Sequence, residues 1–524
     1  PAWVGELYFE YHRGTYTSMA RNKRANRKSE LLLMDVELLS VLAEPKGLSY
    51  PAAELDRLWK VVLLNQFHDI LPGSSIREVY EVTKAEYEAL ARDGQRLLEE
   101  RMRALCGQGN GVTVFNTLGF DRDDVVELGE TSANWLADSD GTLYPVQHTG
   151  GGAAACVRGL PSKGYKGYLP VSGAPAKSPF TIGERSIRTP YYDAAFDESG
   201  NLSLLFDREN GRSVLREGAL GNALRTFEDK PIYYDNWDID IYYTEKYWDL
   251  SGVTSLEWVA DGPVYAALRI ARAFSSSTME QEIRFYAHTR RIDFITRVDW
   301  KESQHLLKVR FPLDLNTDEA TFDIQFGNVT RKTHKNTSWD KARFETCAHK
   351  WMDVSEGGYG VSLLNDCKYG HSVDDGVMCL TLIKSGIEPN PTTDQEEHFF
   401  TYSLFPHAGT WREAGTAREA AKLNQPCHGI LGTAEDGGFS FASVDKPNVV
   451  LETIKRAEDG RGVILRLYEG ENKRTFAKLS LAQTPKSAAE CDLLENDERQ
   501  IEVSENGFSF TVKPYEIKTF RVVF

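Results

Sequence analysis

The sequence has few cysteines, and their positions fit no common cysteine-based site. Seven cysteines occur among 524 residues. The number is odd, and no two cysteines form a Cys-x-x-Cys pair. A disulfide framework or a thiolate zinc site is therefore not expected to organise this fold. Such sparse, unpaired cysteines favour a reducing, cytoplasmic setting.

Long apolar runs and positive charge are also scarce. No apolar run approaches the ~20 residues that a membrane-spanning helix needs, and the longest resemble residues 61–64. The 61 basic residues are outnumbered by 77 acidic ones, which gives a net charge of −16. Because such a surface repels phosphate backbones and anionic lipid, we expect neither a nucleic-acid nor a membrane partner.

The composition is otherwise that of a globular protein. Apolar residues make up 41% and charged residues 26% of the sequence. At ~150 residues per domain, this length predicts ~3–4 domains. Since the sequence opens with Pro1 and not with Met, we expect it to be a piece of a longer polypeptide.

Apolar spacing in residues 1–107 predicts three antiparallel helices. Leu31 and Leu38 belong to a helical pattern over residues 19–44, and a second pattern covers residues 51–67. A third runs over residues 75–102, where Ser75 and Glu78 have the spacing of a capping box. Short turns between the helices predict a three-helix bundle.

From residue 108 onward the pattern predicts β structure. Strands are expected at residues 112–118, 125–128, 264–274 and 281–286, with turns rich in Asp, Asn and Gly between strands. The Gly/Ala-rich residues 150–155 are expected to form a loop. The predicted fold class is α+β multidomain, with the helical bundle followed by antiparallel β-sandwiches. The predicted domains are residues 1–107 (the bundle), 108–180 (a small β domain or linker), 181–430 (a large sandwich) and 431–524 (a terminal β domain).

His68 is the strongest candidate for a metal ligand. His68 and Asp69 lie where the second helix should end, immediately before Pro72 and Gly73 turn the chain. An imidazole held at such a turn suits metal ligation, although it would equally complement the negative end of the helix dipole. No histidine in the sequence has Asp two positions later, and no His-Glu-x-x-His motif occurs. Further ligands are therefore expected outside this chain.

Two other segments combine aromatic and charged residues. Residues 5–18 (GELYFEYHRGTYTS) would line a polar cleft, or form a solvated connector with Ser18 as a helix cap. Residues 233–243 (YYDNWDIDIYY) contain Asp235 and Trp237, which suit contact with a sugar because aromatic rings stack on its C–H faces. The alternation at residues 238–241 is equally typical of a half-buried strand.

Cys347 and His349 are a weaker candidate pair. A cysteine beside a histidine can act as a nucleophile. Residues two apart on a strand also share a face by chance, so the spacing alone does not decide between these interpretations.

Several stretches resemble the family 38 glycoside hydrolases, the α-mannosidases, and most closely their bacterial and cytosolic branch. The likeness lies in GELYFEYHRGTYTS, NKRANRKSE and above all LLNQFHDILPGSSI. It continues through VFNTLGFDR, EDKPIYYDNWDID and RRIDFITRVDW, in matching order over nearly the whole chain. Family members are considerably longer, and this chain resembles their C-terminal half, including a mutarotase-like sandwich.

The resemblance implies a retaining enzyme that removes terminal non-reducing α-D-mannose with one divalent metal. It implies that His68 is one ligand of that metal, zinc first and cobalt as an alternative. By the same likeness Asp69 binds mannose hydroxyls, while Asp235 and Trp237 are further candidates for substrate contact. The nucleophile and acid/base are expected in an N-terminal domain of the same polypeptide, so no catalytic residue is assigned here.

The sequence leaves the function and the oligomeric state open. The alternative function is a non-catalytic carbohydrate-binding or assembly module, because no complete catalytic site is present. α-Mannosides and the N-terminal domain are the expected partners, and a homo-oligomer is left open.

Overall fold

The computed structural model describes residues 2–434 and 438–524 and begins with three long helices. They are α1 (Ala20–Ala43), α2 (Ala52–Asn65) and α3 (Arg77–Leu105). Short 3-10 turns accompany them at Glu10–His12, Gly14–Tyr16 and Glu44–Lys46. All three helices lie within the predicted helical part, and their apolar faces share one core.

The helix starts differ from prediction because tertiary contacts supply the caps. The cap of α1 is Met19, not Ser18, and the carboxylate of Asp394 accepts hydrogen bonds from the Met19 and Ala20 amides. At α3 the predicted capping box is wrong, since the cap is Ile76 and no side chain bonds the helix start. The Ser75 hydroxyl instead donates to the preceding turn.

The first sheet is antiparallel and includes strands from two distant parts of the chain. Strand β27 pairs with β1, and β28 pairs with β6, so the chain returns to this sheet after a long excursion. The strands are β1 (Gly107–Asn116), β2 (Arg122–Leu128), β3 (Trp135–Ala137), β4 (Leu143–Thr149), β5 (Gly152–Leu160), β6 (Gly164–Val171), β27 (His428–Thr433) and β28 (Gly438–Ser440).

The loop expected at residues 150–155 is largely a strand. Residues 153–155 lie in β5 and are buried. Ala154 packs against Val264 and Tyr265 of a neighbouring sheet, while Ala153 and Ala155 face the core of their own sheet. Small side chains allow this close approach, and the sequence pattern does not reveal it.

Three antiparallel sheets between residues 181 and 408 share one large apolar core. The five-stranded sheet contains β7 (Thr181–Ile182), β8 (Ser186–Arg188), β9 (Tyr192–Phe196), β10 (Leu202–Asp207) and β11 (Arg212–Ser213). The six-stranded sheet contains β12 (Ala223–Glu228), β13 (Tyr247–Asp249), β18 (His305–Pro312), β21 (Thr346–Cys347), β24 (Gly370–Asp374) and β25 (Val377–Ser385). The nine-stranded sheet contains β14 (Val253–Asp261), β15 (Tyr265–Phe274), β16 (Ser277–Tyr286), β17 (Ile292–Asp299), β19 (Glu319–Ile324), β20 (Gly327–Lys332), β22 (Trp351–Ser355), β23 (Tyr359–Asn365) and β26 (Glu397–Ala408).

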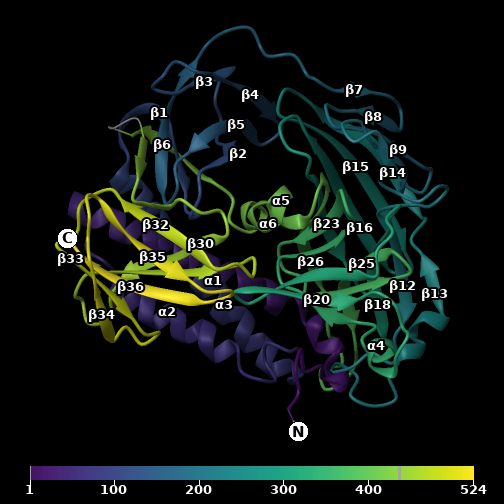
Figure 1. The fold of residues 1–524 in the computed structure, drawn as a ribbon. Helices are drawn as coiled ribbons and strands as arrows, with labels where there is room; N and C mark the ends of the chain where they lie inside the picture. Colours follow the sequence, from purple (N-terminus) through teal and green to yellow (C-terminus); the bar gives the residue numbers. More distant parts are fainter. Residues whose placement is uncertain (1, 435–437) are drawn as a thin grey trace.

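Short helices and a final sandwich complete the chain. The helices are η4 (Ile241–Glu245), α4 (Ser338–Ala342), α5 (Trp411–Ala414) and α6 (Thr416–Asn424). The terminal sheets contain β29 (Ala442–Val444), β32 (Thr475–Leu481) and β35 (Gly507–Val512), and β30 (Val449–Arg456), β31 (Val463–Glu469), β33 (Ser487–Cys491), β34 (Asp497–Ile501) and β36 (Ile517–Val523). These strands pack against the long helices (Figure 1).

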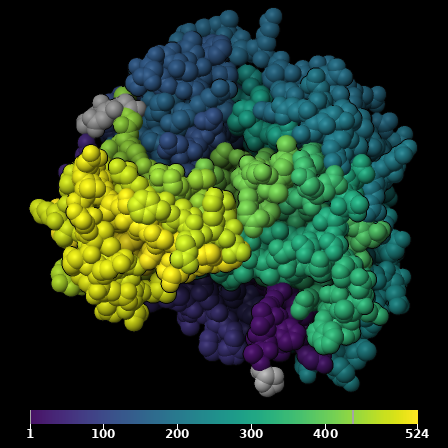
Figure 2. Space-filling view, in the orientation of Figure 1, coloured from purple at the N-terminus to yellow at the C-terminus, as the bar shows by residue number. Residues whose placement is uncertain are grey.

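The predicted fold class is therefore confirmed: a helical N-terminal part is followed by antiparallel β-sandwich structure. On one face the yellow C-terminal sheets lie beside the green segment, and the purple N-terminal segment lies at the lower edge (Figure 2). Within the described residues, no helix is long and apolar enough to cross a membrane.

Candidate functional site

The turn after α2 presents His68 and Asp69 at the surface. Their side chains are 75% and 45% exposed, with 3.5 Å between His68 Nε2 and Asp69 Oδ2. The other Asp69 carboxylate oxygen accepts a hydrogen bond from Ser74 Oγ at 2.8 Å. The Asp69 carbonyl accepts from Ser75 Oγ and Tyr80 OH. The backbone of the turn is thus held firmly while one imidazole and one carboxylate oxygen face outward.

The same turn is tied to the N-terminal segment. Gly73 has φ +95°, a conformation that favours glycine, and its Cα lies against Ser18. The buried ammonium of Lys23 donates to the carbonyls of Ser18, Leu71 and Pro72. The Lys23 amine therefore donates hydrogen bonds to carbonyl oxygens of both segments and holds the segments together.

The loop at residues 233–243 meets both segments at this place. Asn236 Nδ2 donates to the Gly73 carbonyl at 3.1 Å, and Ser18 Oγ donates to the Asn236 carbonyl at 2.7 Å. The amide of Gly14 donates to the Trp237 carbonyl at 2.8 Å. The three segments singled out from the sequence thus form one polar surface, defined here by residues 5–18, 66–75 and 232–240 and called the Asp69 surface.

Of the two predicted sugar-contact residues, Asp235 forms hydrogen bonds that hold this loop to residues 387–388. One carboxylate oxygen of Asp235 accepts from the Ile387 and Glu388 amides, and the other is buried with no hydrogen-bond partner among the described residues. The Trp237 side chain is half-buried. The alternative of a strand at residues 238–241 is wrong, because this part is an irregular loop that leads into η4.

Buried charge lies directly behind the surface. Asp238 pairs with Arg13 at 3.3 Å, and both side chains are almost fully buried. Burial raises the pKa of Asp238, an effect that Arg13 opposes. Burial lowers the pKa of His12, while the carboxylates of Asp238 and Asp69 act in the opposite direction.

Sequence reasoning did not select His12 as a site residue. Its ring lies 4.3 Å from that of Phe9, and its Nδ1 is buried with no hydrogen-bond partner among the described residues. The mixture of His, Arg and aromatic residues at 5–18 indicated a polar cleft. It did not indicate which of these residues would line the cleft.

Exposed apolar side chains surround these polar groups. Trp3 and Val4 directly precede residues 5–18. The others belong to the three segments or to the last turn of α2, and they are Leu7, Phe9, Tyr11, Leu63, Leu64, Phe67, Ile232, Tyr233 and Tyr234. Tyr233 is 75% exposed and Leu7 is 82% exposed. Exposed apolar side chains on segments that meet in this way are typical of a surface that another part of a protein covers.

The Cys347 and His349 pair does not form a nucleophilic dyad. Burial raises the pKa of the Cys347 thiol to about 11 and lowers that of His349 to about 3. The thiol is thus protonated and the imidazole is a very weak base at neutral pH.

His68 and Asp69 offer only two donor side chains for a metal. Across residues 2–434 and 438–524, no group of three or more His, Cys, Asp or Glu side chains is arranged to hold a metal ion. His68 fits one position of a coordination shell, because a neutral imidazole is a common zinc donor.

Comparison with known families explains the order of the segments. The chain matches the family models "Alpha mannosidase middle domain" over residues 10–105, "Glycosyl hydrolases family 38 C-terminal domain" over 187–392 and "Glycosyl hydrolases family 38 C-terminal beta sandwich domain" over 448–520. The helical part, the large sheets and the final sandwich therefore each correspond to one domain of that family. The chain belongs to glycosyl hydrolase family 38.

Curated relatives are similar along the whole chain. Human alpha-mannosidase 2C1 is 35% identical over 546 residues, which covers 99% of this chain and 50% of the relative. Alpha-mannosidase G of Dictyostelium discoideum and the alpha-mannosidase of Saccharomyces cerevisiae are each 30% identical and are covered over 53% and 49% of their lengths. The chain thus spans about half the length of these relatives.

A solved structure has the same fold. The crystal structure of an alpha-mannosidase from Enterococcus faecalis V583 matches with a TM-score of 0.81 at 16% identity. The match covers 98% of this chain and 68% of that chain.

Proposed function

We propose that this chain is the C-terminal half of a cytoplasmic, retaining α-mannosidase that removes terminal non-reducing α-D-mannose. The observation that carries the proposal is the similarity to alpha-mannosidases over 99% of the chain. The presentation of His68 and Asp69 on a firmly held turn supports it. In a retaining mechanism two carboxyl groups ~5–5.5 Å apart flank the bond. We assign both to the half of the relatives that this chain does not match.

His68 would hold one divalent metal, zinc or alternatively cobalt, together with ligands from that other half. When bound, the metal would bind sugar hydroxyls and favour distortion of the ring. Asp69 would accept hydrogen bonds from mannose hydroxyls through its outward oxygen, since its other oxygen already accepts from Ser74. Asp235 would position its loop, and Trp237 would lie behind the bound sugar.

The exposed apolar side chains around the Asp69 surface suit the same arrangement. The side chains of Leu7, Phe67 and Tyr233 are apolar and exposed to water. We propose that the remaining half of the mannosidase covers this area and brings the nucleophile and acid/base to Asp69. Burial of such side chains contributes about 25 cal/mol per Å².

The test uses the complete polypeptide and a chromogenic α-mannoside. We expect His68→Ala to lower both metal content and kcat/KM by at least about 10-fold, the loss that follows even from perturbing an outer-shell partner. Asp69→Asn should raise KM and lower kcat without loss of metal. The exposed His148 provides the control, and His148→Ala should change neither quantity. Unchanged metal stoichiometry in His68→Ala would refute the ligand assignment.

The 524-residue chain alone supplies a second measurement. It should hydrolyse the mannoside no faster than buffer, with or without added zinc, because the proposal places both catalytic carboxyl groups elsewhere. Turnover by the pure chain that a chelator abolishes would contradict that placement.

A further inference from the structure

A cavity of about 420 Å³ lies where four parts of the chain meet. Its walls come from the loop after β1, the β19–β22 region, helices α5 and α6, and strands β30 and β31. This volume falls in the range of about 300–1,000 Å³ that is typical of small-molecule sites. None of its lining residues belongs to the Asp69 surface.

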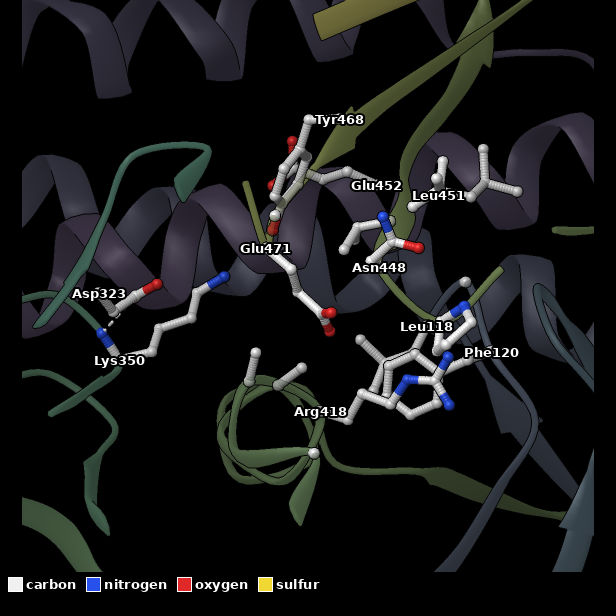
Figure 3. A pocket seen from close by; sticks show the side chains of 18 of the residues that line it. Leu118, Phe120, Asp323, Lys350, Arg418, Asn448, Leu451, Glu452, Tyr468 and Glu471 are labelled. Carbon is white, nitrogen blue, oxygen red and sulfur yellow. Dashed lines mark hydrogen bonds between the residues drawn. The ribbon is translucent and has the colours of Figure 1, made fainter. Parts of the chain in front are cut away.

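Charged side chains of both signs line this cavity, four basic and four acidic. Lys163, Arg412, Asp323 and Glu413 form hydrogen bonds with other described residues. The remaining four are Lys350, Arg418, Glu452 and Glu471. None of these four charged groups forms a hydrogen bond or ion pair with another described residue, although all four are half-buried. The side chains of Lys350, Glu471 and Arg418 lie around the same open space (Figure 3).

Two aromatic residues, Phe120 and Tyr468, also line the cavity and contribute apolar ring faces and one hydroxyl group. The hydroxyl of Tyr468 has no hydrogen-bond partner within the described part of the chain, and its ring lies in the wall of the cavity. Phe120 lies beneath the Arg418 guanidinium, with 4.9 Å between Cζ and the ring centroid. This contact orients the guanidinium while leaving its N–H groups without an acceptor.

Burial shifts the pKa values of Glu471 and Arg418 toward their uncharged forms. It raises the pKa of Glu471, against which Arg412 and Arg418 act, and it lowers the pKa of Arg418, against which Glu471 acts. A partly buried charged group that forms no hydrogen bond is costly, and hydrogen bonds from a ligand would offset that cost.

We propose that this cavity binds a neutral saccharide of one or two rings. Each sugar hydroxyl can donate to Glu452 or Glu471 and accept from Lys350 or Arg418, so one ligand can satisfy groups of both signs. The rings of Phe120 and Tyr468 would contact the C–H faces of the sugar. Basic and acidic side chains line the cavity in equal number, so a net charge of either sign on the ligand gains nothing over a neutral ligand. A small zwitterion would satisfy only one pair of charges.

The experiment measures binding to the 524-residue chain by calorimetry and by saturation-transfer NMR. The probes are methyl α-D-mannopyranoside, α-1,2-mannobiose and maltose, with glycylglycine as the zwitterionic comparison. We expect at least one saccharide to bind. Its Kd should rise about 10-fold in Arg418→Met and in Glu471→Gln, the usual effect of losing a hydrogen bond to a charged group. Glu498→Gln, at an exposed glutamate on the last sandwich, should leave Kd unchanged.

Each other outcome overturns the proposal. Failure of all three saccharides to bind, or binding of glycylglycine alone, would refute it. Saccharide binding that survives in both cavity variants but disappears in Asp69→Asn would place the sugar at the Asp69 surface instead. Circular dichroism checks the folding of each variant, and the isosteric Glu471→Gln carries the test if Arg418→Met fails to fold. Since no hydrolysis is measured, the result is independent of the proposed mannosidase activity.

Discussion

Lys308 and Glu345 form an ion pair inside the large β domain. Their charged atoms are 2.5 Å apart, and the side chains are 2% and 0% exposed. Lys308→Met should lower the free energy of unfolding by about 3–5 kcal/mol, because it leaves the Glu345 carboxylate buried without its cation. Urea unfolding measures this loss. Lys332, which pairs with two carboxylates at the surface, is the control, and Lys332→Met should cost less than about 1 kcal/mol. Equal losses in the two variants would contradict the argument.

His371 should make the stability depend on pH. Burial lowers its pKa in the folded chain to about 3 from the ordinary value of 6.5. Between these values the unfolded chain binds a proton that the folded chain does not. The contribution of His371 is therefore complete above pH 6.5 and is lost as the pH falls, by about 1.4 kcal/mol per pH unit.

The measurement for His371 compares unfolding free energies at pH 7 and pH 5. His371→Gln should lose less stability between these two values than the unchanged chain loses, even though its stability at pH 7 is lower. The exposed His148 is the control, and His148→Gln should keep the original pH dependence. If His371→Gln lost as much unfolding free energy between pH 7 and pH 5 as the unchanged chain, this imidazole would be charged in the folded state.

At the scale of elements, the turn between α2 and α3 depends on Gly73. A Cβ at this position would clash with the backbone of Ser18, and the positive φ adds strain. Gly47 also has a positive φ, but open space surrounds it. Gly47→Ala should therefore cost about 1–2 kcal/mol of strain, and Gly73→Ala should cost clearly more in urea unfolding. Similar costs would mean that the turn moves away from Ser18 freely.

At the scale of the whole molecule, Arg27 connects the helices to the large β domain. From α1 its guanidinium donates to Tyr369 OH, to Asn365 Oδ1 and to the His349 carbonyl at 2.9–3.1 Å. The helices share their apolar core with the final sandwich, whereas the large β domain has its own. Arg27 therefore joins two cores.

Loss of this connection should uncouple the two cores during thermal unfolding. We expect one calorimetric transition for the unchanged chain and two for Arg27→Met, because the hydrogen bonds of the guanidinium to Tyr369, Asn365 and His349 are lost. Arg57, exposed on α2, is the control, and Arg57→Met should keep one transition. A single, unshifted transition in Arg27→Met would show that other contacts suffice.

Local pattern predicted the elements better than their ends. Leu31 and Leu38 lie in α1 as their spacing indicated, and residues 264–274 contain β15. Ser18 and Ser75 were expected at helix starts, yet the cap of α1 comes from Asp394, more than 370 residues away. A side chain that distant leaves no trace in a local window, so such caps are beyond sequence reasoning.

The sequence by itself determined the family resemblance, the helical N-terminal part and the β structure that follows it, and the turn at Pro72 and Gly73 that exposes His68 and Asp69. These features depend on short-range periodicity, turn chemistry and motif order. Only the tertiary structure decided that residues 5–18, 66–75 and 232–240 form one surface, and that Lys350, Arg418 and Glu471 line one cavity. Both arrangements depend on contacts between segments hundreds of residues apart, which form when the sheets and helices pack.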